Sequence, residues 1–204
     1  MTKTLTLALA AILTLASTTA GADDKKNAAA PPAGADAQKA MMEAFARMGE
    51  VRAEHKQLKY FEGSWTSKSL MVMDPKAPPQ ESKGEATIES IYEGRYFTMK
   101  QSVEMGGMSF QGQGMWGYDN LRGKFFTSWV DSMSTGFWLS YGTYDAAKKT
   151  YTYHGEMPDP MQPGKMTKVR QVVRIVDDNH YVFEWNELHE GKEARTMQID
   201  YTRK

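Results

Sequence analysis

Residues 96–118, YFTMKQSVEMGGMSFQGQGMWGY, contain two alternating runs on either side of the dipeptide Gly106-Gly107. The residues that share one side of the first run are Phe97, Met99, Val103 and Met105. Side chains two positions apart in a strand leave on the same face, so this spacing gives one apolar face. A glycine pair between two such runs is typical of a hairpin turn. The stretch therefore predicts two antiparallel strands, 96–105 and 108–118.

Segments of the same kind continue on both sides of this hairpin, rich in aromatic and β-branched residues and separated by short turns. The predicted strands are 64–73, 83–92, 96–105, 108–118, 124–132, 136–142, 150–156, 167–176, 181–189 and 194–203. Strands joined by short loops pair antiparallel, and an up-and-down barrel closes such a meander without free edges. The pattern indicates an all-β sandwich or barrel, and we predict an antiparallel up-and-down β-barrel of about ten strands over residues 61–204.

The beginning of the chain has the pattern of a signal peptide. Lys3 precedes an apolar run at 5–16, and Ala20-Gly21-Ala22 supplies small residues for cleavage. The run of about 12 residues is shorter than the roughly 20 that a membrane-spanning helix needs. Residues 1–22 therefore predict export to the periplasm or the medium, with no integral membrane segment after cleavage. A buried N-terminal helix is the alternative.

Two further segments precede the barrel. Residues 23–38, DDKKNAAAPPAGADAQ, lack large apolar side chains and predict a disordered tether. Apolar residues then recur with helical spacing, so residues 39–60 predict an amphipathic helix that packs over an open end of the barrel or along its wall. Gly49 is expected to kink or split this helix, because glycine is a poor helix former.

Composition excludes several classes of protein. The 25 Lys and Arg balance 25 Asp and Glu, and there is no cysteine. A net charge of zero gives no basic footprint for nucleic acid or an anionic membrane, so no nucleic-acid partner is expected. The absence of cysteine excludes disulfides, thiolate nucleophiles and cysteine-ligated metals.

The aromatic residues suggest what lies inside the barrel. The five tryptophans are Trp65, Trp116, Trp129, Trp138 and Trp185. Polar residues follow three of them on the same strand face, namely Tyr118 after Trp116, Asp131 after Trp129, and Glu187 and His189 after Trp185. If that face points inward, the result is an apolar pocket with a few orienting polar groups. If it points to the rim, the polar groups meet solvent instead.

The candidate ligand-binding residues are Trp65, Arg95, Trp116, Tyr118, Trp129, Asp131, Trp185 and His189. A buried Asp131 needs a partner, for which Arg95, Arg174 or a polar group of the ligand are candidates. The leading prediction is non-catalytic binding of a small apolar or aromatic molecule by a monomeric or weakly associated protein. The competing prediction is a structural or envelope-interaction module with a filled barrel, and the free volume of the interior separates the two.

Signatures of catalysis are sparse. The chain contains no Gly-x-Ser-x-Gly, P-loop or His-Glu-x-x-His motif, so the sequence favours a protein that is not an enzyme. An acid–base pair of Asp131 and His189 across the barrel is conceivable, but no nucleophile or metal completes it.

No cofactor is identified by the sequence, although two remain as alternatives. Met157, Met161 and Met166, which follow His154, offer thioether ligands for Cu(I). His189, on the penultimate predicted strand, is a candidate haem ligand, since some small calycin-like barrels hold haem on one histidine near the C-terminus.

Several motifs occur in a fixed order along the chain. They are His55-x-x-Leu58, Phe61-x-Gly63-x-Trp65, Met73-Asp74-Pro75 with Pro78-Pro79, Gly114-x-x-Gly117-Tyr118-Asp119-Asn120, Trp129-x-Asp131-x-x-x-Thr135-Gly136, Gly142-x-Tyr144-Asp145 and Tyr201-Thr202-Arg203-Lys204. The set resembles a bacterial family known as domain of unknown function 1579. One departure is Glu93-Gly94-Arg95, where the family pattern has Gly-Gly-Arg. The resemblance implies that the predicted barrel is calycin-like, that is, a lipocalin-like β-barrel, and it implies no established reaction and no catalytic residues.

Overall fold

A computed structural model of the chain describes residues 34–73, 76–189 and 191–204. The predicted signal peptide, 1–22, lies outside the described residues, as does the predicted tether up to residue 33. The chain divides into two compact units, Met1–Ala40 and Met41–Lys204, and all of the described strands belong to the second.

The predicted N-terminal helix is divided into three pieces. Helix α1 spans Ala35–Gly49, so it begins before residue 39 and includes the end of the predicted tether. Helix α2 spans Ala53–Gln57, and the 3-10 helix η1 spans Leu58–Phe61. The break follows Gly49, as expected of a glycine. None of the residues of α1 is buried, whereas α2 and η1 bury His55, Leu58 and Phe61. Burial is thus confined to the second half of the predicted helix.

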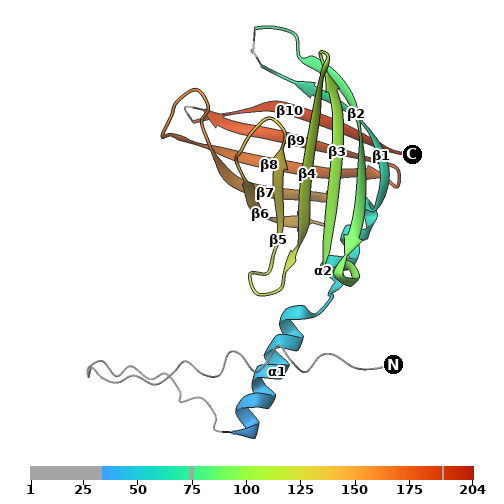
Figure 1. Cartoon of the computed structure of the whole chain (residues 1–204), viewed down its shortest axis with the longest axis vertical. Coiled ribbons are helices and arrows are strands. Elements are labelled where there is room, and N and C mark those ends of the chain that lie inside the picture. The colour runs from blue at the N-terminus through green and yellow to red at the C-terminus, as the bar shows by residue number, and fades with distance from the viewer. Residues whose placement is uncertain (1–33, 74–75, 190) are drawn as a thin grey trace, which may run out of the picture. The chain divides into compact units, whose positions relative to one another are not determined.

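Ten strands form one closed antiparallel barrel, in which each strand pairs with the next and β10 pairs with β1 (Figure 1). They are β1 Gly63–Met71, β2 Gln80–Ile91, β3 Tyr96–Met105, β4 Met108–Asp119, β5 Lys124–Asp131, β6 Trp138–Asp145, β7 Thr150–Pro158, β8 Met166–Asp177, β9 His180–His189 and β10 Lys192–Arg203. A 3-10 turn, η2 Tyr92–Gly94, joins β2 to β3. The predicted up-and-down barrel is confirmed. Among the described residues, no helix has both the length and the apolar content that a membrane crossing requires.

Alternation along the strands creates the inner face. In β3, Phe97 and Met99 are 1% and 5% exposed, while Lys100 between the inward positions is exposed. The apolar face predicted for this strand therefore lines the interior, because side chains of period two share one face.

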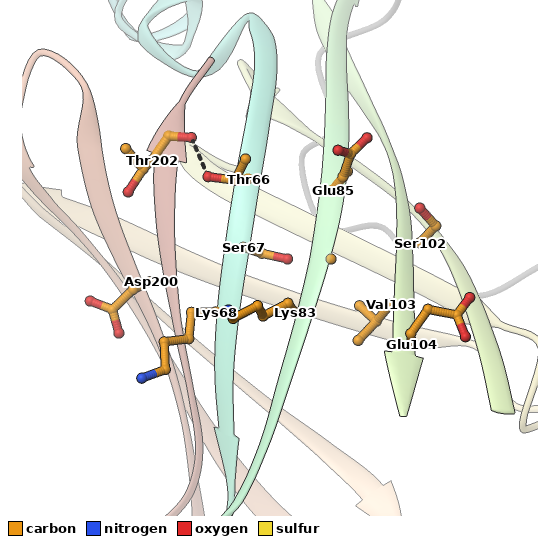
Figure 2. A pocket seen from close by; sticks show the side chains of 11 residues that line it. Thr66, Ser67, Lys68, Lys83, Glu85, Ser102, Val103, Glu104, Asp200 and Thr202 are labelled. Carbon is orange, nitrogen blue, oxygen red and sulfur yellow. Dashed lines mark hydrogen bonds between the residues drawn. The ribbon is translucent and has the colours of Figure 1, made fainter. Parts of the chain in front are cut away.

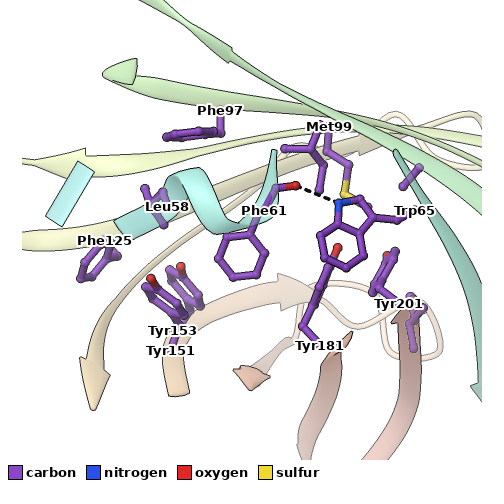
Figure 3. Close-up of a cluster of buried hydrophobic side chains, with 13 residues drawn as sticks. Leu58, Phe61, Trp65, Phe97, Met99, Phe125, Tyr151, Tyr153, Tyr181 and Tyr201 are labelled. Atoms are coloured by element: carbon purple, nitrogen blue, oxygen red, sulfur yellow. Dashed lines mark hydrogen bonds between the residues drawn. The ribbon is translucent and has the colours of Figure 1, made fainter. Parts of the chain in front are cut away.

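The hydrophobic core lies at the end of the barrel that α2 and η1 enter. Figure 3 shows Leu58 and Phe61 of η1 among the aromatic side chains of the strands. The largest fully buried hydrophobic residues are Trp65, Tyr151, Phe97, Leu58 and Ile88. We call this end, defined by these residues together with Phe61, Tyr181 and Tyr201, the closed end.

Candidate functional site

The closed end is filled by a plug that η1 inserts between the strands. Phe61 packs edge-to-face against Tyr181, with ring centres 5.1 Å apart, and against Trp116 at 6.0 Å. Trp65 donates its indole N–H to the carbonyl of Phe61 at 2.8 Å. Aromatic packing and a buried hydrogen bond therefore fix the plug from several strands at once.

Arg203 of β10 also contacts the chain segment that carries the plug. Arg203 donates to the carbonyl oxygens of Tyr60 (2.6 Å) and Glu62 (2.7 Å). Its guanidinium carbon lies 4.1 Å from the centre of the Trp65 ring, which is the geometry of a cation–π contact. The end of β10 and the segment before β1 are thus joined by one side chain.

A second set of contacts holds the segment between α1 and α2. The side-chain amide of Asn120 donates to the carbonyls of Met48 (3.0 Å) and Glu50 (2.9 Å), and Arg95 Nε donates to the carbonyl of Gly49 (2.9 Å). His55 is 4% exposed and lies edge-to-face with Tyr118. Several residues of the family motifs therefore have a structural role around this segment.

The opposite end of the barrel contains the other aromatic group. Register places Trp129 opposite Trp138, and the Trp138 and Trp185 rings lie 4.6 Å apart between centres. We call this end the barrel mouth and define it by Trp129, Asp131, Trp138, Trp185, Glu187 and His189. Each indole N–H there is bonded to an inward-facing side chain: Trp129 to Asp131 (3.1 Å), Trp138 to Gln171 (3.2 Å) and Trp185 to Glu187 (3.0 Å). These bonds fix the planes of the three rings.

Glycines on neighbouring strands make room for two of these rings. A Cβ atom at Gly112 would overlap the Trp129 ring, and one at Gly114 would lie 2.9 Å from it. A Cβ at Gly155 would lie 2.8 Å from the Trp138 ring. Cβ atoms in proteins do not approach aromatic carbons so closely. The Trp129 and Trp138 rings therefore lie directly against the backbone of these glycines. One face of each ring covers the wall. The Trp138 ring also packs against Trp185 and is 8% exposed, whereas Trp129 and Trp185 are half-buried.

Two carboxylates accompany the rings. Glu187 accepts from Trp185 Nε1 and from Thr196 Oγ1 (2.9 Å), and its second oxygen lies 2.8 Å from His189 Nε2. Asp131 accepts from Trp129 Nε1 and from the backbone N–H groups of Met133 (2.9 Å) and Ser134 (3.0 Å). Both carboxylates are therefore held in place at the mouth by hydrogen bonds.

A belt of buried polar side chains lies between the mouth and the closed end, although Trp129 of the mouth also packs against the core cluster. Gln171 Oε1 accepts from Ser140 Oγ at 2.7 Å as well as from Trp138, and Gln101 Oε1 accepts from the Tyr201 hydroxyl at 2.9 Å. Gln101 and Gln171 are 7% and 4% exposed. Sequence reasoning missed both, although each interrupts an otherwise apolar strand face. That interruption is the signal that identifies them.

The structure divides the predicted site residues into separate groups. Trp65, Trp116 and Tyr118 belong to the closed end, and Arg95 lies at the turn before β3, where it binds Gly49 and Glu93. The residues that lie at the mouth are Trp129, Asp131, Trp185 and His189. The arginine partner predicted for Asp131 is wrong, because the strand and its following loop supply neutral donors instead.

The structure places the side chains considered as copper or haem ligands poorly for binding those groups. His154 is exposed on the outer face of β7, so Met157, three positions later, leaves on the opposite face. Met161 is 85% exposed. His189 Nε2 is bonded to Glu187 at the rim, so that nitrogen is not presented to a haem iron. The described residues include no group of three or more His, Cys, Asp and Glu side chains placed to hold a metal.

Two hollows of the described residues are bordered mainly by outward-facing side chains. One, of about 630 Å³, is bordered by outward-facing side chains of β10, β1, β2 and β3, including Lys68, Lys83 and Glu104 (Figure 2). The other, of about 390 Å³, lies against the outer side of β5 and β6, beside Phe126 and Tyr141. Val173, Phe183 and Trp185 face inward yet are only half-buried.

Solved structures share this barrel. Rv2717c from M. tuberculosis is similar with a TM-score of 0.56 and 14% identity, over 76% of this chain and 99% of that chain. The S-type phycobiliprotein lyase CPES from Guillardia theta is similar with a TM-score of 0.53 and 12% identity, over 77% of this chain and 95% of that chain. At these identities the likeness establishes a common fold, which is the lipocalin-like barrel expected from the sequence. No curated protein matches the sequence of the chain.

The sequence comparison identifies the family. Residues 50–203 match the family described as "Protein of unknown function (DUF1579)". The match begins at the residue after α1 and extends through almost all of β10, so it includes the plug, the closed end and the barrel mouth. This protein belongs to the DUF1579 family.

Proposed function

We propose that the barrel binds a small, flat and largely apolar molecule at its mouth, without catalysis. The observation that carries the proposal is the placement of Trp129 and Trp138 on Gly112, Gly114 and Gly155. Glycine at these positions weakens the strands, since it adds no side chain to the packing. The gain is an inner wall of aromatic faces, which suit a flat apolar guest.

Accessible surface inside the barrel supports the same proposal. Phe183 and Trp185 face inward and are half-buried, so the surface they retain borders space within the lumen. The polar belt and the two carboxylates supply a small number of fixed polar groups beside that surface. Such a combination of apolar walls and a few oriented polar groups is typical of small-molecule sites.

The test is direct binding of a neutral planar probe, N-phenyl-1-naphthylamine, measured by its fluorescence with the full chain. We expect Trp129→Leu and Trp185→Leu each to weaken binding about tenfold, because each removes a large aromatic contact. Phe126→Leu is the matched control, since Phe126 belongs to the outer wall. Equal binding by the wild type and both tryptophan variants would overturn the proposal.

Native mass spectrometry of protein purified from its own cells provides a second measurement. A recurrent retained mass that the Trp185→Leu variant loses would agree with a ligand at the mouth. A retained mass that both tryptophan variants keep would place the molecule elsewhere.

An interaction module with a filled barrel is the second candidate, and the outer wall favours it. Val130 and Leu139 are 44% and 42% exposed on β5 and β6, and Phe137 in the loop between these strands is 69% exposed. Hydrogen exchange of the protein in a cell extract separates the candidates. Protection confined to β5 and β6 favours a protein partner, whereas protection of β9 at the mouth favours a ligand.

We also infer that the protein is exported, on the basis of the signal-peptide pattern in residues 1–22. N-terminal sequencing of the envelope or secreted form should begin at Asp23. A cytoplasmic form that retains Met1 would overturn this inference.

A further inference from the structure

Two carboxylates lie on the inward face at the barrel mouth, and His189 is the one ion-pair partner that the described residues offer them. Asp131 and Glu187 both lie on the inner side of their strands, bonded to the tryptophan two positions earlier. Among the groups that donate to these carboxylates, His189 is the one that can carry a positive charge. The remaining donors are indole, hydroxyl and backbone N–H groups, which orient a carboxylate but leave its charge in place.

The arginines near the mouth form ion pairs on the outer face of the barrel. Arg170 is bonded to Glu193 and Arg195 to Glu184, and both arginines leave on the outer face of the barrel. Within the described strands, Lys192 is the basic residue that shares the inward side at this end. It pairs in register with His189 at the rim, where it is exposed. The charges of the mouth and of the outer wall are therefore separated by the barrel wall.

The aromatic rings point to the same kind of guest for an independent reason. A cation over the face of an aromatic ring is attracted by the ring's quadrupole, and tryptophan gives the strongest such contact. Trp129 and Trp185 lie on the inward side of their strands and are only half-buried, so part of each ring remains accessible to a guest. Negative side chains beside tryptophan faces favour a positive charge on a flat molecule over a neutral or negative one.

We propose that the ligand of the barrel mouth is a flat organic cation, held against the rings of Trp129 and Trp185 with its charge toward Asp131 and Glu187. The inference rests on the proposed function and specifies the chemical class of the ligand.

The experiment compares three probes of similar shape and different charge on the full chain. They are N-methylquinolinium, 1-methylnaphthalene and 1-naphthoate, a cation, a neutral molecule and an anion. Equilibrium dialysis at low ionic strength measures each affinity, because salt screens charge interactions at an open site. We expect the cation to bind about tenfold more tightly than the neutral probe, and the anion to bind most weakly.

Substitution of the carboxylates identifies the source of that preference. Glu187→Gln and Asp131→Asn should each reduce the preference for N-methylquinolinium over 1-methylnaphthalene several-fold, because an amide oxygen can still accept from the indole N–H but carries no charge. Glu184→Gln is the matched control, because Glu184 lies on the outer face of the same strand as Glu187. The comparison of the three probes on the wild type needs no variant, so it stands if a variant fails to fold.

The outcomes separate the two proposals. If 1-methylnaphthalene binds as tightly as N-methylquinolinium and Trp185→Leu weakens both, the cation inference fails and the proposed function stands. A preference that Glu184→Gln removes and Glu187→Gln preserves also overturns the inference. If none of the probes binds, or if Trp185→Leu changes none of the affinities, the proposed function fails and the inference fails with it.

Discussion

Arg203 stacks on Trp65, with the guanidinium carbon 4.1 Å from the ring centre. The same guanidinium donates to the carbonyls of Tyr60 and Glu62, so a residue of β10 holds the segment that carries the plug. A planar fork is needed to make these contacts together, and lysine cannot reproduce them.

Replacing this arginine tests the connection. We expect Arg203→Lys to lower the free energy of unfolding by about 2 kcal/mol, through loss of two hydrogen bonds and of part of the stacking. Denaturant unfolding measures the change. Arg195→Lys, on the outer face and paired with Glu184, should cost less than about 0.5 kcal/mol. Equal effects of the two substitutions would contradict a special role for Arg203.

The close contact between Gly112 and the Trp129 ring gives a second prediction. In Gly112→Ala the new methyl group overlaps the Trp129 ring, so the ring must move and its hydrogen bond to Asp131 is disturbed. Overpacking of this kind costs about 1–3 kcal/mol. The indole N–H resonance of Trp129 should shift in NMR spectra. Gly136→Ala is the control, since a Cβ there has free space. An unchanged Trp129 resonance would show that the ring does not lie on Gly112.

The buried belt predicts a cost for removing an acceptor. Gln171→Leu leaves the Trp138 N–H and the Ser140 hydroxyl without their acceptor, which should lower the free energy of unfolding by about 2 kcal/mol. Adding Ser140→Ala should recover part of the loss, because one stranded donor disappears. Gln198→Leu, whose amide binds Asp200, serves as the control outside this network. A double variant less stable than Gln171→Leu would argue against the stranded-donor explanation.

His55 makes stability depend on pH. Burial lowers the pKa of His55 below its ordinary value of 6.5; Glu54 raises it, and Arg52 and Arg95 lower it further. The unfolded chain therefore binds a proton more readily than the folded chain as the pH falls below about 6.5. The stabilisation is complete above that pH and declines below it.

Denaturant unfolding between pH 7.5 and pH 5.5 measures this decline. His55→Gln should be less stable at pH 7.5 and should show a flatter pH dependence than the wild type. The two proteins differ at this residue alone, so the difference between the two curves isolates His55. Parallel curves would contradict a buried neutral imidazole.

The strands were predictable because period-two alternation is a local property of the chain. The same property placed Asp131 beside Trp129, and the structure joins the two by a hydrogen bond. Alternation does not reveal how far along the barrel axis a residue lies. That depth depends on register with neighbouring strands, so Trp65 and Trp129 looked equivalent in the sequence and lie in different parts of the barrel.

The interior polar residues were missed for a different reason. Gln101 follows Met99 on the inward face of β3, and Gln171 lies between Val169 and Val173 on that of β8. A pattern of alternating apolar residues predicts the inward face of a strand but does not indicate that a single glutamine within the pattern is buried. Its burial is favourable only because Tyr201 in one case, and Ser140 with Trp138 in the other, come from distant strands to donate to it. Such partners follow from tertiary structure and not from local pattern.

The pairing of β1 with β10 affects how the chain folds. Trp65 of β1 lies opposite Arg203 of β10, so the barrel cannot close until β10 has paired with β1. Bringing such distant segments together costs chain entropy, and topologies rich in distant pairings fold slowly. During synthesis on the ribosome β1 keeps an unpaired edge until the C-terminal residues emerge. The barrel can therefore close only after β10 has left the ribosome.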